Sequence, residues 1–107
     1  MSMNLIADSG STKTAWCLVC DGQIVKQFET PGINPFFQTE DEIVAQLKEG
    51  LLPEVEENCV ENIYFYGAGC ANPEKNRVLE GLLMSVVGSK TAFVASDMLG
   101  AARGLLG

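Results

Sequence analysis

The residues best suited to chemistry stand near the start of the chain, in segment 8–14, which reads Asp-Ser-Gly-Ser-Thr-Lys-Thr. A short apolar run precedes this segment and a longer one, 15–20, follows it, so we expect a tight turn between two strands. Glycine can take the positive φ that aims consecutive backbone N–H groups at one point, and such a concave row binds anions, phosphate above all. The hydroxyl groups of Ser9, Ser11 and Thr12 would add uncharged donors. The turn therefore predicts a phosphate site, with an ordinary hairpin turn as the alternative.

Three further groups lie at turns or at the ends of apolar runs. Asn34 stands in a short segment broken by two prolines, Gly67 to Gly69 ends a near-continuous apolar run, and Asp97 follows another. A carboxylate such as that of Asp97 is a suitable general base for a hydroxyl within hydrogen-bond reach. Each group also has a purely structural interpretation: a turn residue for Asn34, close packing for the glycines, and a helix N-cap for Asp97.

The size and charge of the chain limit the partners it can have. With 107 residues, of which 47% are apolar, it can form one globular domain. It carries a net charge of −7 and no histidine, so it lacks the basic surface that nucleic-acid binding requires. The charge of a bound phosphate would have to be balanced by backbone dipoles, by a metal ion and by Lys13, unless that lysine is only a solvated surface charge.

We expect a cytoplasmic protein without a membrane partner, because the N-terminus has no basic flank and no apolar run approaches the length of a membrane span. The four cysteines stand at positions 17, 20, 59 and 70. Cys17 and Cys20 have C-x-x-C spacing, but they lie in a predicted strand, where residues three apart point to opposite faces and cannot clamp one zinc ion. We therefore expect reduced thiols rather than a metal site or a disulfide.

Five strands are predicted. Asp21-Gly22 is a strong hairpin signal between two β-rich runs, so the first three strands should form an antiparallel meander. The apolar run that ends at the glycines is typical of a parallel strand covered on both faces. The predicted strands are 4–8, 14–20, 23–30, 62–69 and 91–95.

Three helices are predicted as well. Thr39 and Glu42 form a capping box, and apolar residues follow at helical spacing. Pro53 should bend or end this helix, with the acidic residues 54–57 as its solvated tail. The second helix runs from the Asn72-Pro73 start to Gly88, and the third covers about residues 98–106 after Ser96-Asp97.

The order βββαβαβα predicts an α/β domain with a mixed five-stranded sheet, in which a meander is followed by right-handed crossovers and helices cover both faces. Ligands of such open sheets collect at the carboxyl ends of the strands. Asp8, the glycines 67–69 and Asp97 all follow strand ends, so we expect them to converge on one cleft.

These residues also resemble a known superfamily. Segment 8–12 fits D-x-G-x-[ST], the first phosphate motif of the actin, hexokinase and heat-shock ATPase superfamily, and βββαβαβα is the order of its ribonuclease-H-like half-domain. The longer D-S-G-S-T-K-T, followed by Pro31-Gly32-Ile33-Asn34-Pro35, Gly67-Ala68-Gly69 and Ser96-Asp97, is similar to the N-acetylglucosamine kinase branch, which is grouped with the BadF/BadG/BcrA/BcrD ATPases. The resemblance covers nearly the whole chain.

The resemblance implies ATP and Mg²⁺ as cofactors. Asp8 would orient the Mg²⁺ ion through water, and Thr12 would donate its hydroxyl to the phosphates. The cradle for the β- and γ-phosphates would consist of Ser9, Gly10, Ser11, Thr12 and Lys13. Members of the family often have glycine at the positions of Ser9 and Ser11, so serine fits there only if neither position needs a strongly positive φ.

The resemblance also implies a sugar site and a reaction. Asn34 would hydrogen-bond a sugar hydroxyl, Gly69 would line the substrate site, and Asp97 would hold the sugar and accept the proton of its attacking hydroxyl. Phosphoryl transfer needs mainly positioning and charge neutralisation from the protein. The expected function is thus that of an ATP-dependent sugar kinase acting on N-acetylglucosamine or a related hexosamine.

In this superfamily ATP lies between two half-domains, and the chain holds no second D-x-G-x-T turn. We therefore expect residues 1–107 to be the N-terminal lobe of a two-lobe protein, inactive alone, with the C-terminal lobe as its partner; a homodimer stays open. One alternative is the lobe of a BadF-type ATPase activator, whose cluster cysteines would lie outside this chain. Another is a metal-dependent nuclease with Asp8 and Asp97 as ligands, which leaves the hydroxyl-rich turn unexplained and conflicts with the acidic charge.

Overall fold

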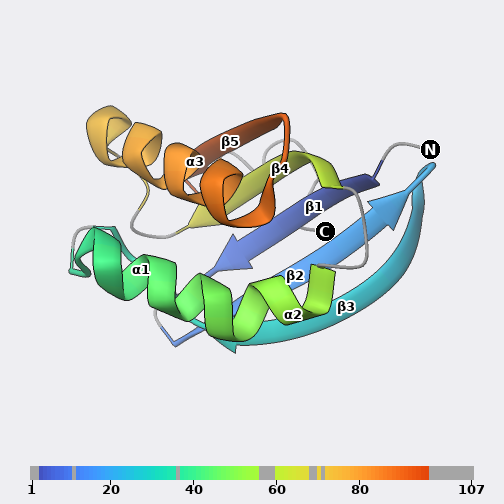
Figure 1. Ribbon diagram of the computed structural model, residues 1–107, viewed down its shortest axis with the longest axis horizontal. Helices are drawn as coiled ribbons and strands as arrows, with labels where there is room; N and C mark the ends of the chain where they lie inside the picture. Colours follow the sequence, from blue (N-terminus) through green and yellow to red (C-terminus); the bar gives the residue numbers. More distant parts are fainter. Residues whose placement is uncertain are drawn as a thin grey trace.

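The computed structural model describes residues 3–10, 12–35, 37–55, 60–67, 70 and 72–96. Figure 1 shows their arrangement as a sheet with helices packed against it. The strands are β1 (Met3–Ser9), β2 (Lys13–Cys20), β3 (Gln23–Pro31), β4 (Val60–Gly67) and β5 (Thr91–Ser96), and the helical elements are α1 (Glu40–Gln46), the π-helical turn η1 (Leu47–Leu51), α2 (Leu52–Val55) and α3 (Pro73–Val87).

The strands form one mixed five-stranded sheet in the order β3-β2-β1-β4-β5. The pairs β1–β2 and β2–β3 are antiparallel, whereas β4 runs parallel to both β1 and β5. The predicted meander and the mixed α/β sheet are therefore confirmed. Strand β1 lies at the centre, with its carboxyl end beside the carboxyl end of β4.

Local sequence signals set the ends of these elements. Asp21 and Gly22 have φ values of 51° and 79°, so two consecutive left-handed residues close the β2–β3 hairpin as the Asp-Gly pair predicts. The Thr39 hydroxyl accepts the N–H of Glu42 and the Glu42 carboxylate accepts the N–H of Thr39, which is the predicted capping box. Helix α3 begins at the N-cap Asn72 and ends at left-handed Gly88, also as predicted.

Pro53 was predicted to bend or to end the helix, and it does not end it. The five-residue π turn η1 precedes the proline, and α2 continues through it to Val55. Proline lacks an N–H and its ring clashes with the carbonyl four residues back, and a widened turn relieves both problems. Glu54 is not simply a solvated tail either, since its carboxylate lies 2.6 Å from the Lys26 ammonium of β3.

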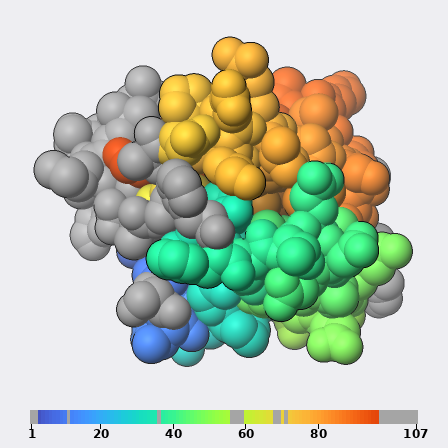
Figure 2. All heavy atoms as spheres, turned by 90° about the vertical axis from the view of Figure 1, so that its left-hand side faces the viewer, coloured from blue at the N-terminus to red at the C-terminus, as the bar shows by residue number. Residues whose placement is uncertain are grey.

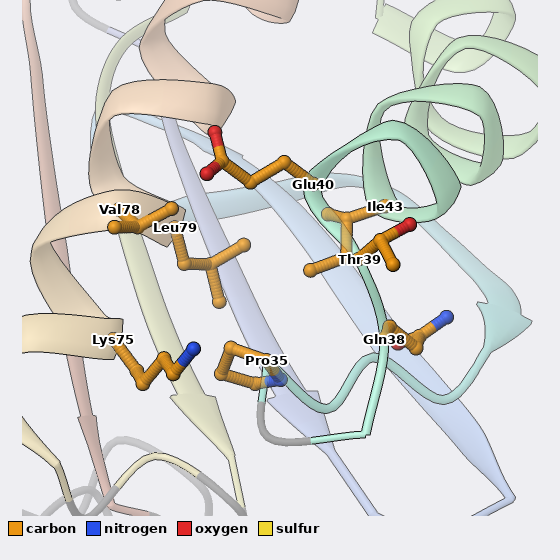
Figure 3. Close-up of a pocket in the computed structure, with 8 residues that line it drawn as sticks. All are labelled: Pro35, Gln38, Thr39, Glu40, Ile43, Lys75, Val78 and Leu79. Atoms are coloured by element: carbon orange, nitrogen blue, oxygen red, sulfur yellow. The ribbon is translucent and has the colours of Figure 1, made fainter.

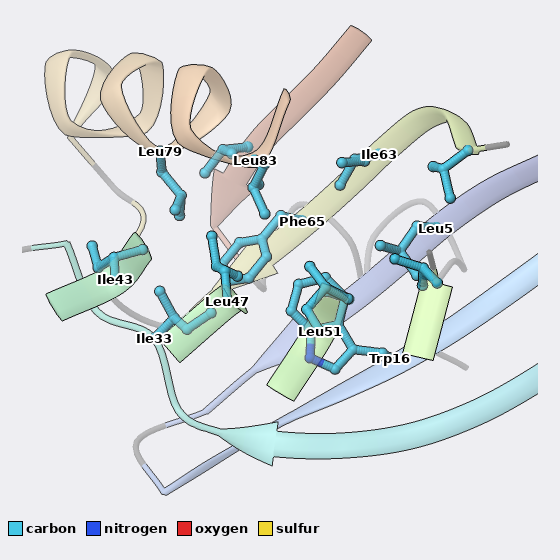
Figure 4. Packing of buried hydrophobic residues seen from close by; sticks show 14 of the residues in the cluster. Leu5, Trp16, Ile33, Ile43, Leu47, Leu51, Ile63, Phe65, Leu79 and Leu83 are labelled. Carbon is cyan, nitrogen blue, oxygen red and sulfur yellow. The ribbon is translucent and has the colours of Figure 1, made fainter. Parts of the chain in front are cut away.

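The core lies between the sheet and the helices, which cover the same face in the described part of the chain (Figure 1). Figure 4 shows side chains from the helices meeting those of the central strands around Trp16 and Phe65. The third predicted helix, and with it the cover of the second face, falls in 97–107 and lies outside the described residues. No helix in the described ranges is long and apolar enough to cross a membrane.

Candidate phosphate and sugar site

The ends of three parallel strands lie in register at one edge of the sheet. Ser9 pairs with Gly67 on β4, and Gly67 pairs with Ser96 on β5. The predicted phosphate turn therefore leaves the sheet at the same level as the strand that leads to Asp97. Figure 2 views the molecule from this edge, with the blue β1–β2 region below and the green and yellow-orange helices beside it.

Side chains at the end of β1 alternate between the two faces of the sheet. Ala7 and Ser9 are buried on the side of the helices, whereas Asp8 between them is exposed. The Asp8 carboxylate thus stands at the strand end on the face opposite to the described helices. It is accessible there to a solvated metal ion.

The conformation of Gly10 differs from the expectation. Among the described residues the glycines with positive φ are Gly22 and Gly88, so Gly10 does not use the left-handed region. Its N–H donates to the carbonyl oxygen of Lys13 at 2.9 Å and closes the hairpin. A Cβ added at Gly10 would lie 3.7 Å from that oxygen, which is ordinary contact. The described residues therefore give no steric reason for glycine at this position.

The exposed part of the turn carries a hydroxyl and an ammonium group. Thr12 and Lys13 are both exposed. The Lys13 ammonium lies 2.9 Å from the Glu29 carboxylate of β3, in a pair whose side chains are more than half exposed. Such exposed pairs contribute little to stability and can exchange partners easily. Ser11, the remaining predicted member of the turn, lies outside the described residues.

The Ser9 hydroxyl points to a different set of partners from the one we expected. Ser9 is 2% exposed, and its oxygen lies 2.8 Å from the Thr14 hydroxyl and accepts the N–H of Ile33 at 3.0 Å. Ser9 has a negative φ. Serine can therefore occupy this position, where members of the family often have glycine. The alternation of buried Leu5 and Ala7 with their neighbours was the sequence signal that could have placed Ser9 on the core side.

The segment that carries Asn34 lies against the turn. The N–H of Gly32 donates to the Thr12 carbonyl at 3.2 Å. The N–H of half-buried Asn34 donates to the Gln38 side chain at 2.7 Å, and the Asn34 carbonyl accepts the N–H groups of Phe37 and Gln38. Asn34 therefore begins a turn next to the predicted phosphate site, and the structure brings these two predicted parts together.

Gly67 has a packing role. A Cβ at this position would lie 2.8 Å from the Cys70 sulfur and 3.1 Å from the Phe65 ring, both buried, so the strand end tolerates only glycine without rearrangement. Among the described cysteines, Cys17, Cys20 and Cys70 form no disulfide. The predicted site residues Gly69 and Asp97 lie outside the described residues, as does Cys59.

A pocket of about 350 Å³ opens between α1 and α3. Figure 3 shows Lys75 and Leu79 projecting from α3, and Glu40 and Ile43 projecting from α1. None of the predicted site residues lines this pocket, although Pro35 follows Asn34 directly. We therefore place the candidate site at the strand ends and not in this pocket.

The chain resembles proteins of known structure. No family model and no curated protein matches it. A solved structure, the putative N-acetylglucosamine kinase from Porphyromonas gingivalis, is 44% identical over 99% of this chain, with a TM-score of 0.88. The chain covers 38% of the length of that protein.

Two more distant structures share the fold. A putative N-acetylmannosamine kinase from Listeria monocytogenes is 19% identical, with a TM-score of 0.60 over 89% of this chain and 35% of its own. A protein of unknown function with an actin-like ATPase fold, from Bacteroides thetaiotaomicron, is 13% identical, with a TM-score of 0.58 over 95% of this chain and 37% of its own. The predicted resemblance is thus confirmed: the chain has an α/β fold of the actin-like ATPase type, similar in sequence and structure to part of a putative N-acetylglucosamine kinase.

Proposed function

We propose that the chain is the N-terminal lobe of an ATP-dependent sugar kinase that phosphorylates N-acetylglucosamine or a related hexosamine. The observation that carries this proposal is the 44% identity, over nearly the whole chain, to the Porphyromonas gingivalis protein. The register of the strand ends supports it, because the phosphate turn and the residue before Asp97 reach the same edge of the sheet.

The residues at the turn fit ATP and Mg²⁺. Protein sites for Mg²⁺ use one or two carboxylates, with water and substrate phosphates as the other ligands. In the described ranges no group of three or more acidic or thiol side chains could hold a metal ion. A Mg²⁺ ion held by a single carboxylate, water and phosphate needs only the exposed Asp8. Bound Mg²⁺ would neutralise negative charge on the phosphates. The chain itself has a net charge of −7 and cannot do this with a basic surface.

The remaining roles follow the same edge of the sheet. The bare backbone at Gly10 and the exposed Thr12 hydroxyl would contact the phosphates. Asn34 would hydrogen-bond a sugar hydroxyl, and Gly69 would line the sugar site. Asp97 would hold the attacking hydroxyl and accept its proton as the new bond to phosphorus forms.

The site would be completed by a second lobe. The chain covers 38% of the length of the Porphyromonas gingivalis protein, which leaves ample length for a partner lobe in a full-length protein. That lobe would supply the opposite wall of the nucleotide site. The lobe described here would then contribute the metal-orienting carboxylate and the base.

The test is Asp97→Asn in the full-length protein. Loss of the proton acceptor should lower kcat by a factor of about 100 to 10,000, the range typical of general-base catalysis, while ATP affinity stays unchanged. Asp21→Asn is the matched control, because Asp21 closes the distant β2–β3 hairpin at a positive φ that asparagine adopts readily. Normal turnover by the Asp97 variant would show that the base was misassigned.

A further inference from the structure

Two buried hydroxyl groups join the phosphate turn to the segment that precedes Asn34. Ser9 is 2% exposed and Thr14 is fully buried, and they face each other across the β1–β2 pair. Their oxygens are 2.8 Å apart. The Thr14 hydroxyl donates to the Pro31 carbonyl at 3.1 Å, and the Ile33 N–H donates to the Ser9 oxygen at 3.0 Å. The two side chains thus contact both ends of a three-residue stretch.

The two hydroxyls can arrange their protons in two ways. Each hydroxyl has one proton, and either oxygen of the Ser9–Thr14 contact could be the donor. In one arrangement Ser9 donates to Thr14 and Thr14 donates to the Pro31 carbonyl; in the other, Thr14 donates to Ser9 and Ser9 donates to the Ile33 carbonyl at 3.2 Å. In both, the Ile33 N–H donates to Ser9, and bonds linked in this way polarise and strengthen one another.

Helix α1 secures the same stretch from its other side. The Gln46 amide donates to the carbonyls of Pro31 and Gly32, at 2.8 and 3.0 Å, and its oxygen accepts from Gln38 at 2.8 Å. The Ile33 side chain is 2% exposed and lies in the core near α1 (Figure 4). The backbone groups of Gly32 are therefore held by the helix and the turn, since its carbonyl accepts from Gln46 and its N–H donates to Thr12.

We propose that Ser9 and Thr14 form a clamp, the Ser9–Thr14 clamp, that fixes the position of Asn34 relative to the phosphate turn. Both act as positioning residues for the sugar, and Ser9 does so in place of the phosphate contact expected from the sequence. The inference rests on the proposed function for its kinetic consequence and on the structure alone for the clamp itself. Asn34 follows Ile33 directly. Loosening the clamp therefore displaces Asn34, the proposed sugar-binding residue, and weakens sugar binding more than nucleotide binding.

The clamp is tested by amide hydrogen exchange of Ile33 in the full-length protein. Ser9→Ala and Thr14→Val each remove one hydroxyl of the Ser9–Thr14 clamp. Amide exchange at Ile33 should then become about tenfold faster, as expected for a lost buried hydrogen bond. Thr14→Ser keeps the hydroxyl and should restore protection. Thr91→Val is the matched control, since Thr91 bonds Asn62 at the far end of the sheet. Unchanged Ile33 exchange in both clamp variants would overturn the proposal.

The kinetic consequence is measured on the same variants. Ser9→Ala and Thr14→Val should raise KM for the sugar about tenfold, with KM for ATP and kcat within about twofold of wild type, and Thr14→Ser should behave as wild type. Equal changes in both KM values, or faster Ile33 exchange with an unchanged sugar KM, would refute the positioning role. If the wild-type protein phosphorylates no sugar, the proposed function fails, while the exchange result still decides whether the clamp exists.

Discussion

At the turn between β1 and β2, Gly10 lacks both of the usual structural reasons for a glycine. Its φ lies outside the left-handed region, and a Cβ would meet no atom of the described residues closer than 3.7 Å. Gly67 and Gly22 are different, because the first has no room for a Cβ and the second has a φ of 79°. Close approach of a ligand to the backbone is the remaining physical reason for glycine at position 10.

Gly10→Ala should therefore weaken nucleotide binding without destabilising the fold. The fold should keep its stability or gain about 0.4–1 kcal/mol from reduced chain entropy in the unfolded state. Nucleotide affinity of the full-length protein should fall at least about tenfold, since a methyl group would occupy the space of a phosphate oxygen. Urea unfolding and nucleotide titration check the two parts.

Gly22→Ala is the control, because the strain of a left-handed alanine should cost about 1–2 kcal/mol without affecting nucleotide. If Gly10→Ala binds nucleotide as wild type does, the turn is an ordinary hairpin.

At the scale of the elements, η1 and β3 approach each other closely at one point. A Cβ at Gly50 would lie 2.9 Å from the Thr30 methyl group. The Thr30 hydroxyl accepts the buried indole N–H of Trp16 at 2.8 Å, so Thr30 cannot turn aside without leaving that donor unpaired. The contact sets how closely the helix lies over the meander.

Gly50→Ala should destabilise the fold by about 1–3 kcal/mol through overpacking, despite the better helix propensity of alanine. Gly81→Ala in α3 is the matched control: no atom of the described residues lies within 4 Å of a Cβ at this position, so the fold should gain about 0.5–1 kcal/mol. Adding Thr30→Ser to Gly50→Ala removes the methyl group, keeps the hydroxyl and should recover most of the loss. Denaturant unfolding measures all four proteins, and no recovery in the double variant would contradict the contact.

The sequence predicted those elements whose ends are marked by local chemistry. These signals set the ends of their elements through residues close in sequence, so they can be predicted without knowing the fold. They are Asp21-Gly22, the Thr39 capping box and Asn72-Pro73. The passage of the helix through Pro53 and the contact of Glu54 with Lys26 depend on packing between distant segments. The same reason explains why the Ser9 partners were not foreseen, since Ile33 lies 24 positions away.

At the scale of the whole molecule, the proposed lobe would offer one side of a site. Its strand ends bring the turn, Gly67 and Ser96 into register, and the segment of Asn34 lies against the turn. Asp8 provides the exposed carboxylate at this edge. A nucleotide bound to this edge alone would stay open to solvent, where its contacts are weak. Catalysis is therefore expected only when a second lobe covers the site.

The central claim is tested most directly by measuring ADP release with and without N-acetylglucosamine. The full-length protein should release ADP with Mg²⁺ and ATP only when this sugar or a related hexosamine is added, and the 107-residue chain at equal concentration should release none. ATP hydrolysis that does not depend on any sugar would contradict the kinase and favour an ATPase activator. Sugar-dependent ADP release by the 107-residue chain alone would contradict the proposal that this chain forms only one side of the site.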